Sequence, residues 1–275
     1  MKHIVIPTRS FEDTLFTFRY AKMWFGDKDV KYHLLNAYSE PAKSSEIMVS
    51  LVDLMQKESI RHLESQQKEI ISVFPDFKNH IALHSVYGDL PSAINHLNDS
   101  VPISMIAMAT TGAGKIRRFF GGSHTANVVA KTKCPTLSIP YGYELNQIEE
   151  ICFFVDYENI PNSLLLSEVK SLAQKKNCAI KAVHIHTDKK LDKEGTYESE
   201  CKSAFQNAFA GLDYSLKSFY APTVASGIQN YIAMENPSLV VMIAHKQNFL
   251  ERMFNASDSK LITNVSDVPV LVFHD

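Results

Sequence analysis

Residues 102–109 read Pro102-Ile103-Ser104-Met105-Ile106-Ala107-Met108-Ala109, a short apolar run that returns in the second half of the chain. Its counterpart, residues 237–244, reads Pro237-Ser238-Leu239-Val240-Val241-Met242-Ile243-Ala244. A second pair follows, Cys134-Pro135-Thr136-Leu137 and Val268-Pro269-Val270-Leu271. The offset is 135 residues from Pro102 to Pro237 and 134 from Pro135 to Pro269. The sequence therefore predicts one structural unit present twice, with one residue lost from the intervening loop of the second copy.

Each half alternates short β-rich runs with longer segments of helical period, which is typical of parallel strands covered by helices. A polar connector near residues 142–149 separates the halves. We therefore expect an α/β protein of two doubly wound, Rossmann-like domains, residues 1–143 and 144–275, each a five-stranded parallel sheet flanked by helices. The expected strands are residues 3–8, 31–37, 80–86, 103–109 and 136–139, then 151–156, 179–187, 214–220, 238–244 and 269–273.

Helix signals lie between the expected strands of the first half. Ser10 can cap a helix that Gly26 ends, and a longer helix is expected over residues 44–73. Asp89 and Pro91 begin another, since proline suits the first turn of a helix. Phe16, Met23 and Trp24 are expected to pack in the core rather than to form an exposed stripe.

Composition excludes several classes of function. The chain has 275 residues and a formal net charge of -2, so it offers no broad basic surface for nucleic acid. Residues 1–7 enter a strand directly, and no apolar run reaches the roughly 20 residues that span a bilayer. We therefore expect a cytoplasmic protein without a membrane partner. Cys134, Cys152, Cys178 and Cys201 include no CxxC pair and are expected to be ordinary reduced thiols.

The loop after the fourth strand is the place to look for a ligand, because ligands of parallel sheets gather at the carboxyl ends of the strands. Residues 109–125 read ATTGAGKIRRFFGGSHT. Ile116 follows Gly114-Lys115 where a Walker A loop needs Ser or Thr, and Arg117 stands at the third glycine of GxGxxG. Neither of those phosphate-binding motifs is present.

The loop instead resembles that of the universal stress protein (UspA-like) family, in which G-x2-G-x9-G-S/T wraps the phosphates and ribose of ATP. Gly112 and Gly122-Ser123 match the second and third glycines and the hydroxyl residue. Residues 4–8, 86–94 and 134–137 extend the resemblance, which covers nearly the whole chain. It implies two adenine nucleotide alpha hydrolase-like domains in a tandem member of the family.

The resemblance also implies a nucleotide site in the first domain and a remnant in the second. ATP with Mg²⁺ is the candidate ligand; without it, no cofactor is expected. The implied nucleotide-binding residues are Thr8, Arg9, Ala37, Gly112, Gly114, Gly122, Ser123, His124 and Thr125, and the remnant is Asp156 with Ser257.

Three departures from the family pattern bear on this site. Ala109 stands at the first motif glycine, and Arg9 replaces the aspartate that follows Pro-Thr. In the second half Asp156 restores that aspartate, but Ala256-Ser257 replaces the Gly-Ser pair. Loss of ATP binding is therefore favoured for the second half. In the first half Arg9, Lys115, Arg117 and Arg118 either recruit phosphate or form a solvated basic turn.

The sequence offers no catalytic constellation. His184 and His186 share one face of a strand, yet no third ligand is identifiable, so we expect ordinary strand histidines and no metal site. Ser123 and His124 are adjacent, which is poor geometry for a nucleophile and its base, and a surface histidine is favoured. No catalytic residue is assigned.

Three functions remain in view. The first is a stress-response regulator that binds an adenine nucleotide in its first domain and presents its surface to an unknown protein partner. The second is an interaction or scaffold protein without ligand, and slow ATP hydrolysis ranks last. Residues 136–139 and 270–273 are expected to join the domains as an intramolecular pseudo-dimer, and a further homodimer stays open.

Overall fold

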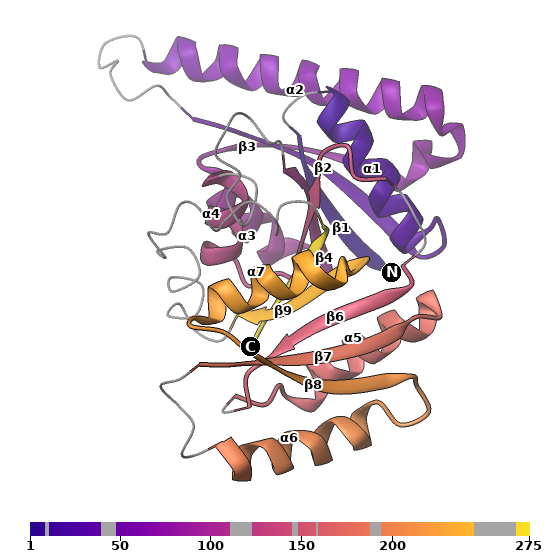
Figure 1. Ribbon diagram of the computed structural model, residues 1–275. Helices are drawn as coiled ribbons and strands as arrows, with labels where there is room; N and C mark the ends of the chain where they lie inside the picture. The colour runs from indigo at the N-terminus through magenta and orange to yellow at the C-terminus, as the bar shows by residue number, and fades with distance from the viewer. Residues whose placement is uncertain are drawn as a thin grey trace. The chain divides into compact units, whose positions relative to one another are not determined.

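The computed structural model in Figure 1 describes residues 1–8, 11–39, 48–110, 123–144, 148–157, 159–187, 194–244 and 268–275. These residues divide into two compact units, with the division between Gly142 and Tyr143. We call them unit 1 and unit 2. The domain limits expected from the sequence, 1–143 and 144–275, stay a prediction.

Unit 1 contains a parallel sheet in the order β3-β2-β1-β4-β5. Its strands are β1 (Lys2–Pro7), β2 (Val30–Tyr38), β3 (Ile81–Tyr87), β4 (Met105–Thr110) and β5 (Thr136–Pro140). Its helices are α1 (Phe11–Phe25), α2 (Met48–Val73), the short η1 (Pro75–His80), α3 (Leu90–Ser100) and α4 (Ser123–Lys131).

Two layers of helices cover the sheet of unit 1 because its strands alternate buried side chains between their faces. On one face Phe18 of α1, Tyr32 of β2 and Phe77 of η1 bring their rings within 4.9 to 5.9 Å of one another. The other face, under α3 and α4, holds a cluster that includes Val5, Leu35, Ile94, Leu97, Ile106 and Val128. Trp24, at 2% exposed, is a core residue as expected.

Two helix ends in unit 1 follow the signals in the sequence. Gly26 ends α1 with φ of +77°, a conformation that glycine adopts without a Cβ penalty. Asp89 caps α3 through a 3.0 Å hydrogen bond that the Ser92 N–H donates to its carboxylate. Ser10 and residues 44–47 lie outside the described residues.

Unit 2 repeats this architecture. Its parallel sheet has the order β8-β7-β6-β9-β10, so each strand takes the place of its counterpart in β3-β2-β1-β4-β5. The predicted fold class, with strands in both halves of the chain, is confirmed. The elements are β6 (Glu150–Val155), α5 (Ser163–Lys176), β7 (Ala179–His186), α6 (Glu194–Ala208), β8 (Tyr214–Tyr220), α7 (Val224–Glu235), β9 (Leu239–Ala244) and β10 (Val270–His274).

Adjacent phenylalanines of β6 show the two faces of this second sheet. Phe153 stacks on Phe205 of α6 at 5.9 Å between ring centroids, and Phe154 meets Tyr231 of α7 at 5.8 Å. Thr223 begins α7 with a capping box, since its hydroxyl accepts from the Ser226 N–H and the Ser226 hydroxyl accepts from the Thr223 N–H.

The strand boundaries correct one detail of the predicted repeat. From β4 to β9 and from β5 to β10 the offset is the same, because Met105 corresponds to Leu239 and Thr136 to Val270. No residue has been lost from the loop after the fourth strand. The difference of one residue lies before that strand, between Pro102 and Met105, where Pro237 and Leu239 are one residue closer. Pairing Pro102 with Pro237 had shifted the alignment of the two fourth strands by one residue.

Register then relates every strand of unit 1 to its counterpart in unit 2. Ile4 pairs with Met105 and Ile151 with Leu239, so Ile4 and Ile151 are equivalent. On the second strands, Tyr32 and Ile180 pair with these two residues and are therefore equivalent as well. The third strands follow in the same way from their own pairings.

All four cysteines are buried free thiols, as expected. Burial raises the pKa of Cys201 to about 12 and that of Cys178 to about 11, so both stay protonated at neutral pH. None of the helices in the described ranges is long and apolar enough to cross a membrane.

Candidate functional site

The expected site lies at the carboxyl ends of the strands of unit 1, and part of it can be placed. Thr8, Ala37, His124 and Thr125 are among the described residues, and Ser123 begins α4. Arg9, Gly112, Gly114, Gly122 and Ser257 lie outside the described residues, as do Lys115, Arg117 and Arg118. Their predicted roles stay predictions.

Thr8 is held firmly where β1 ends. Its N–H donates to the Leu35 carbonyl at 2.8 Å, and its hydroxyl donates to the same oxygen at 3.3 Å. The Asn36 amide then donates to the Thr8 carbonyl at 3.4 Å and reaches the hydroxyl at 3.3 Å. Thr8 is buried, so these contacts replace the water that its polar atoms would otherwise bind. Sequence reasoning missed Asn36, whose only signal is a polar residue inside an apolar strand.

Ala37 follows Asn36 and lies on the opposite face of β2. It is half-buried and packs against the apolar cluster under α3, together with Val86. Beside it, the rings of Tyr38 and Tyr87 meet edge to face at 5.8 Å, and Tyr87 is exposed. The carboxyl ends of β2 and β3 therefore present small apolar and aromatic groups.

The amino end of α4 supplies the other described part of the site. Backbone N–H groups of a first helical turn lack partners within the helix and favour anions. His124 in this turn is exposed, whereas Thr125 is buried. Exposure of His124 agrees with the surface histidine that the sequence favoured. On neighbouring β4, the Thr110 hydroxyl donates to the Ile139 carbonyl at 3.3 Å.

In unit 2 the remnant aspartate, Asp156, lies at the corresponding edge and has a local hydrogen-bond partner. Asp156 is half-buried, and the Asn159 amide donates to its carboxylate at 2.8 Å across a local backbone bridge. Burial first, and then the nearby carboxylates of Asp156 and Glu198, raise the pKa of Cys201. The remnant aspartate therefore braces a turn of unit 2.

His184 and His186 pack among tyrosines at this edge. The Tyr157 ring stacks on His184 at 3.8 Å, and Tyr220 stacks on His186 at 4.8 Å. The two imidazoles meet at 4.6 Å, which confirms that they share one face of β7. Among the residues that the structure describes, no group of three or more His, Cys, Asp or Glu side chains is arranged to hold a metal ion. Both histidines pack against tyrosine rings, and His184 also contacts the backbone of Val155 and Tyr157.

Asn36 and His184 are equivalent by register, and so are Thr8 and Val155. His184 Nδ1 lies 3.1 Å from the Val155 carbonyl and 3.4 Å from the Tyr157 N–H, so according to its tautomer it donates to the first or accepts from the second, whereas the Asn36 amide donates to the Thr8 carbonyl. In each unit, a side chain of the second strand thus contacts the backbone where the first strand ends.

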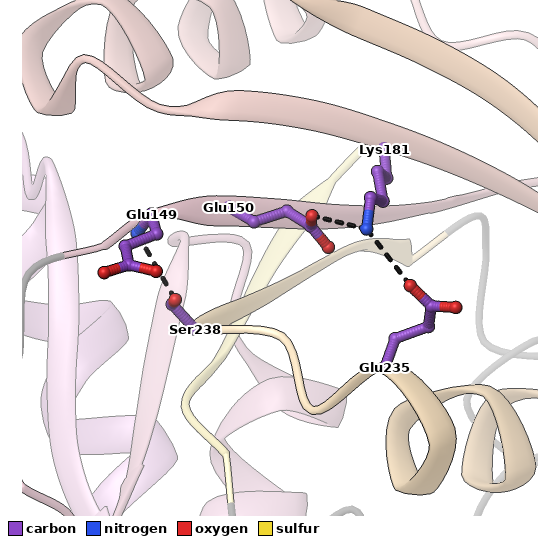
Figure 2. Close-up of polar contacts among 5 residues, drawn as sticks. All are labelled: Glu149, Glu150, Lys181, Glu235 and Ser238. Atoms are coloured by element: carbon purple, nitrogen blue, oxygen red, sulfur yellow. Dashed lines mark hydrogen bonds and ion pairs between the residues drawn. The ribbon is translucent and has the colours of Figure 1, made fainter.

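A second set of polar contacts lies on the other face of the sheet of unit 2, the face covered by α7, which corresponds to the face under α3 in unit 1. In unit 2 the Lys181 ammonium contacts Glu150 at 2.6 Å and Glu235 at 3.0 Å, as Figure 2 shows. Hydrogen bonds to Glu150 and Glu235 raise the pKa of Lys181, and the Lys181 bond lowers the pKa of Glu235. In the same figure the Glu149 N–H donates to the Ser238 hydroxyl at 3.3 Å. The positions of Glu150 and Lys181 correspond to His3 and His33 of unit 1.

Comparison with known proteins shows which family shares this architecture. A sequence model of the universal stress protein family matches residues 1–140. No curated protein matches the chain. Among solved structures, a universal stress protein of Archaeoglobus fulgidus is similar at 17% identity and a TM-score of 0.69, over 99% of this chain and 96% of that one.

Two structures from Pseudomonas aeruginosa share the fold with TM-scores of 0.60. One is a putative universal stress protein at 15% identity, over 100% of this chain and 93% of that one. The other is described as functionally unknown, at 14% identity over 100% of this chain and 92% of that one. With a family match over residues 1–140 and the same strand order in both units, the chain belongs to the universal stress protein family as a tandem member.

Proposed function

We propose that this protein is a cytoplasmic stress-response regulator whose first unit binds an adenine nucleotide. Family membership suggests the stress-response role. The observation that carries the nucleotide proposal is the start of α4 at Ser123, directly after Gly122 of the sequence motif. That start presents the N–H groups of a first helical turn immediately after the glycine, where a phosphate needs them.

The described residues supply a frame for such a ligand. Thr8 is fixed at the end of β1 by Leu35 and Asn36, and Ala37 leaves an uncharged surface beside it. In this proposal Gly112, Gly114 and Gly122 allow the backbone to approach the phosphates, with Ser123 and His124 beside them. Arg9 adds positive charge, and Mg²⁺ accompanies ATP. Occupancy changes the surface that a protein partner meets.

Unit 2 is assigned no nucleotide. Its aspartate accepts from Asn159, and the Tyr157 ring, 1% exposed, lies stacked on His184 beside it. These contacts favour a second candidate for unit 2, a surface for protein interaction without a ligand. No catalytic role is proposed for either unit; the thiols of Cys178 and Cys201 are buried, and burial raises their pKa values.

Thermal unfolding with and without millimolar Mg-ATP tests the proposal. A ligand that binds only the folded state adds about 2.7 kcal/mol of stability at 100 times its Kd. We expect the wild type to be stabilised and Gly122→Asp to lose the stabilisation, because the aspartate places a negative charge where the phosphates bind.

Ala256→Asp is the matched control, since Ala256 is the counterpart of Gly122 in unit 2. It should retain the response of the wild type. An intact cooperative transition with no stabilisation of the wild type would contradict the nucleotide proposal and leave the interaction protein in its place.

A further inference from the structure

Three histidines form a hydrogen-bonded chain across neighbouring strands of unit 1. His3 Nδ1 lies 2.9 Å from His33 Nε2, and His33 Nδ1 lies 2.8 Å from His84 Nε2. The residues come from β1, β2 and β3, and each strand is offset by two residues from the last. His33 lies two residues before Leu35 and therefore on the same face of the sheet, under α3. We call these three residues the histidine chain.

The centre of the histidine chain is shielded from water. His33 is 4% exposed, whereas His3 and His84 are half-buried. The pKa of His33 is lowered to about 4, chiefly by burial and also by the positive charges of His84, His3 and Lys31. Burial lowers the pKa of His84 as well.

The surroundings of His33 offer it no compensating charge among the groups described. The groups that act on it, His84, His3 and Lys31, all carry or can carry positive charge. The Lys31 ammonium donates to the Asn79 carbonyl at 2.8 Å. Helix α3, which packs on β2, carries His96 and Asp99, and both of these side chains are exposed.

Counting protons shows how much acid the histidine chain can absorb. Each of its two hydrogen bonds holds one proton between two nitrogens, and one outer nitrogen remains at either end. Three neutral imidazoles carry three protons, two in the bonds and one on an outer nitrogen. A fourth proton fills the other outer nitrogen. A fifth must enter a bond that already holds a proton, so two N–H groups face each other and that bond breaks.

Unit 2 has a different arrangement at the equivalent positions. Glu150, Lys181 and Lys217 stand where His3, His33 and His84 stand in unit 1, and Glu235 adds a carboxylate from α7. The Lys181–Glu235 ion pair persists through weak acid, because the pKa of Glu235 is lowered from an already acidic value. Between the ordinary pKa values of histidine and glutamate, these three strand positions change their charge in unit 1 alone. Elsewhere in unit 2, burial lowers the pKa of His274 of β10 to about 4.

The geometry points to an acid-responsive device in unit 1: the His3–His33–His84 chain accepts one proton intact and a second only by breaking, so that acidification opens the β1–β2–β3 side of unit 1 while β6–β8, which carry no histidine chain at these positions, stay paired. Opening would change the surface that unit 1 offers a partner. This inference does not depend on nucleotide binding.

Proton linkage gives the direction and the steepness of the pH dependence with which unit 1 opens. The pKa of His33 is lower in the folded protein, so its contribution to stability is complete above about pH 6.5 and is lost as pH falls toward about 4. In the opened state the three histidines bind three extra protons, against one in the intact chain. The ratio of closed to open unit 1 therefore falls about 100-fold per pH unit once the histidines of the open state are charged.

Hydrogen–deuterium exchange of the full chain tests the device. It is read separately over peptides of β1–β3 and β6–β8, between about pH 7.5 and about pH 4.5, after correction for intrinsic exchange. We expect β1–β3 to lose protection below about pH 6 while β6–β8 retain it. Loss of protection in both units at the same pH, or in neither, would overturn the inference.

Variants separate the histidine chain from other acidic effects. His33→Leu removes the central ring and should keep β1–β3 protected at a pH where the wild type opens. His96→Gln removes an exposed histidine of α3 and should open as the wild type does. Opening of His33→Leu at the pH of the wild type would refute the device.

Ring-nitrogen NMR of the three histidines in the wild type keeps the test independent of how well a variant folds. The folded protein should take up no more than one proton in the histidine chain before β1–β3 open. Uptake of two or more while these strands stay protected would also refute the device.

Discussion

Asn36 and His184 occupy the same position on the second strand of their units, and the side chain of each contacts the backbone at the end of the first strand. The Asn36 amide lies 3.4 Å from the Thr8 carbonyl, and His184 Nδ1 lies 3.1 Å from the Val155 carbonyl. An amide contacts both the backbone and the Thr8 hydroxyl, whereas an imidazole also stacks on Tyr157. The same position thus puts an amide beside the Thr8 hydroxyl in unit 1 and an imidazole stacked on Tyr157 in unit 2.

Removing the Asn36 side chain should weaken Mg-ATP binding more than it lowers the free energy of unfolding. Asn36→Ala loses two hydrogen bonds of 3.3 and 3.4 Å, which are long, so we expect unfolding to cost about 1 kcal/mol less than in the wild type. Thr8 then loses its fixed orientation, and stabilisation by Mg-ATP should fall. Urea unfolding and calorimetric titration measure the two effects.

Ser85→Ala is the control for Asn36→Ala, because its hydroxyl contacts Ser59 of α2 at 2.7 Å and not Thr8. It should leave the ATP response unchanged. An Asn36→Ala protein with full ATP stabilisation would show that Thr8 needs no brace to bind the nucleotide, or does not bind it.

The cap of α3 gives a second prediction. Asp89→Ala removes the acceptor of the Ser92 N–H, which lies 3.0 Å away, and should lower the free energy of unfolding by about 1 kcal/mol. The Ser92 hydrogen bond lowers the pKa of Asp89, so this contribution is present at neutral pH and is lost as pH falls through the acidic range below the ordinary value. Urea unfolding at neutral and acidic pH measures the loss.

Asp99→Ala, on the exposed side near the end of the same helix, is its control and should change stability little. A stability difference between Asp89→Ala and the wild type that is equal at all pH values would contradict the role of the carboxylate.

The sequence predicted the strands well because their apolar runs are bounded by turns and helices of clear period. The expected strand 214–220 coincides with β8, whereas expected strand 103–109 begins only at Met105. Ile103 and Ser104 continue the apolar run, but the Ser104 N–H donates to the His3 carbonyl before the β4 ladder begins. Composition cannot distinguish such a residue from the strand that it precedes.

The polar arrangements could not be predicted, since they depend on which strands are neighbours and in what register. His3, His33 and His84 are far apart in sequence and match no motif, yet the pairing of β1, β2 and β3 makes them adjacent. Asn36 likewise acquires its role only through the position of Thr8 beside it. By contrast, Gly112 and Gly122 form a local motif that sequence reveals, and their roles stay predictions.

Gly227 of α7 should tolerate no side chain. A Cβ atom there would lie 2.3 Å from Ile185 Cγ2 and 3.1 Å from the Ala221 Cβ. Gly227→Ala should therefore destabilise unit 2 by about 1–3 kcal/mol through overpacking, although alanine favours helices. Differential scanning calorimetry measures the change.

A double-mutant cycle with Ile185→Ala identifies the cause of the Gly227→Ala effect. Ile185→Ala removes the clashing methyl group, so Gly227→Ala should cost much less in that background. Equal costs in both backgrounds would show that the clash with Ile185 is not the cause.

Lys181 supports the last prediction, which concerns how unit 2 responds to acid. Figure 2 shows the Lys181 ammonium in contact with the carboxylates of both Glu150 and Glu235. Lys181→Met removes that ammonium and leaves the two carboxylates without it. Because all three side chains are partly exposed, we expect a loss of about 1 kcal/mol at neutral pH. Lys202→Met breaks the surface pair with Glu198 on α6 and should leave the free energy of unfolding almost unchanged, because water screens this exposed pair.

The pH dependence distinguishes the loss of an ion pair from a packing defect in Lys181→Met. In the wild type the pKa of Glu235 is lowered, so its ion pair stabilises the fold at neutral pH and is lost as pH falls through the acidic range. Without Lys181 the two carboxylates repel, and protonating either one relieves the repulsion. The difference in free energy of unfolding between the wild type and Lys181→Met should therefore shrink between pH 7 and about pH 4. Chemical denaturation at several pH values measures it, and a difference that stays constant would mean that Lys181 acts through the packing of its alkyl chain.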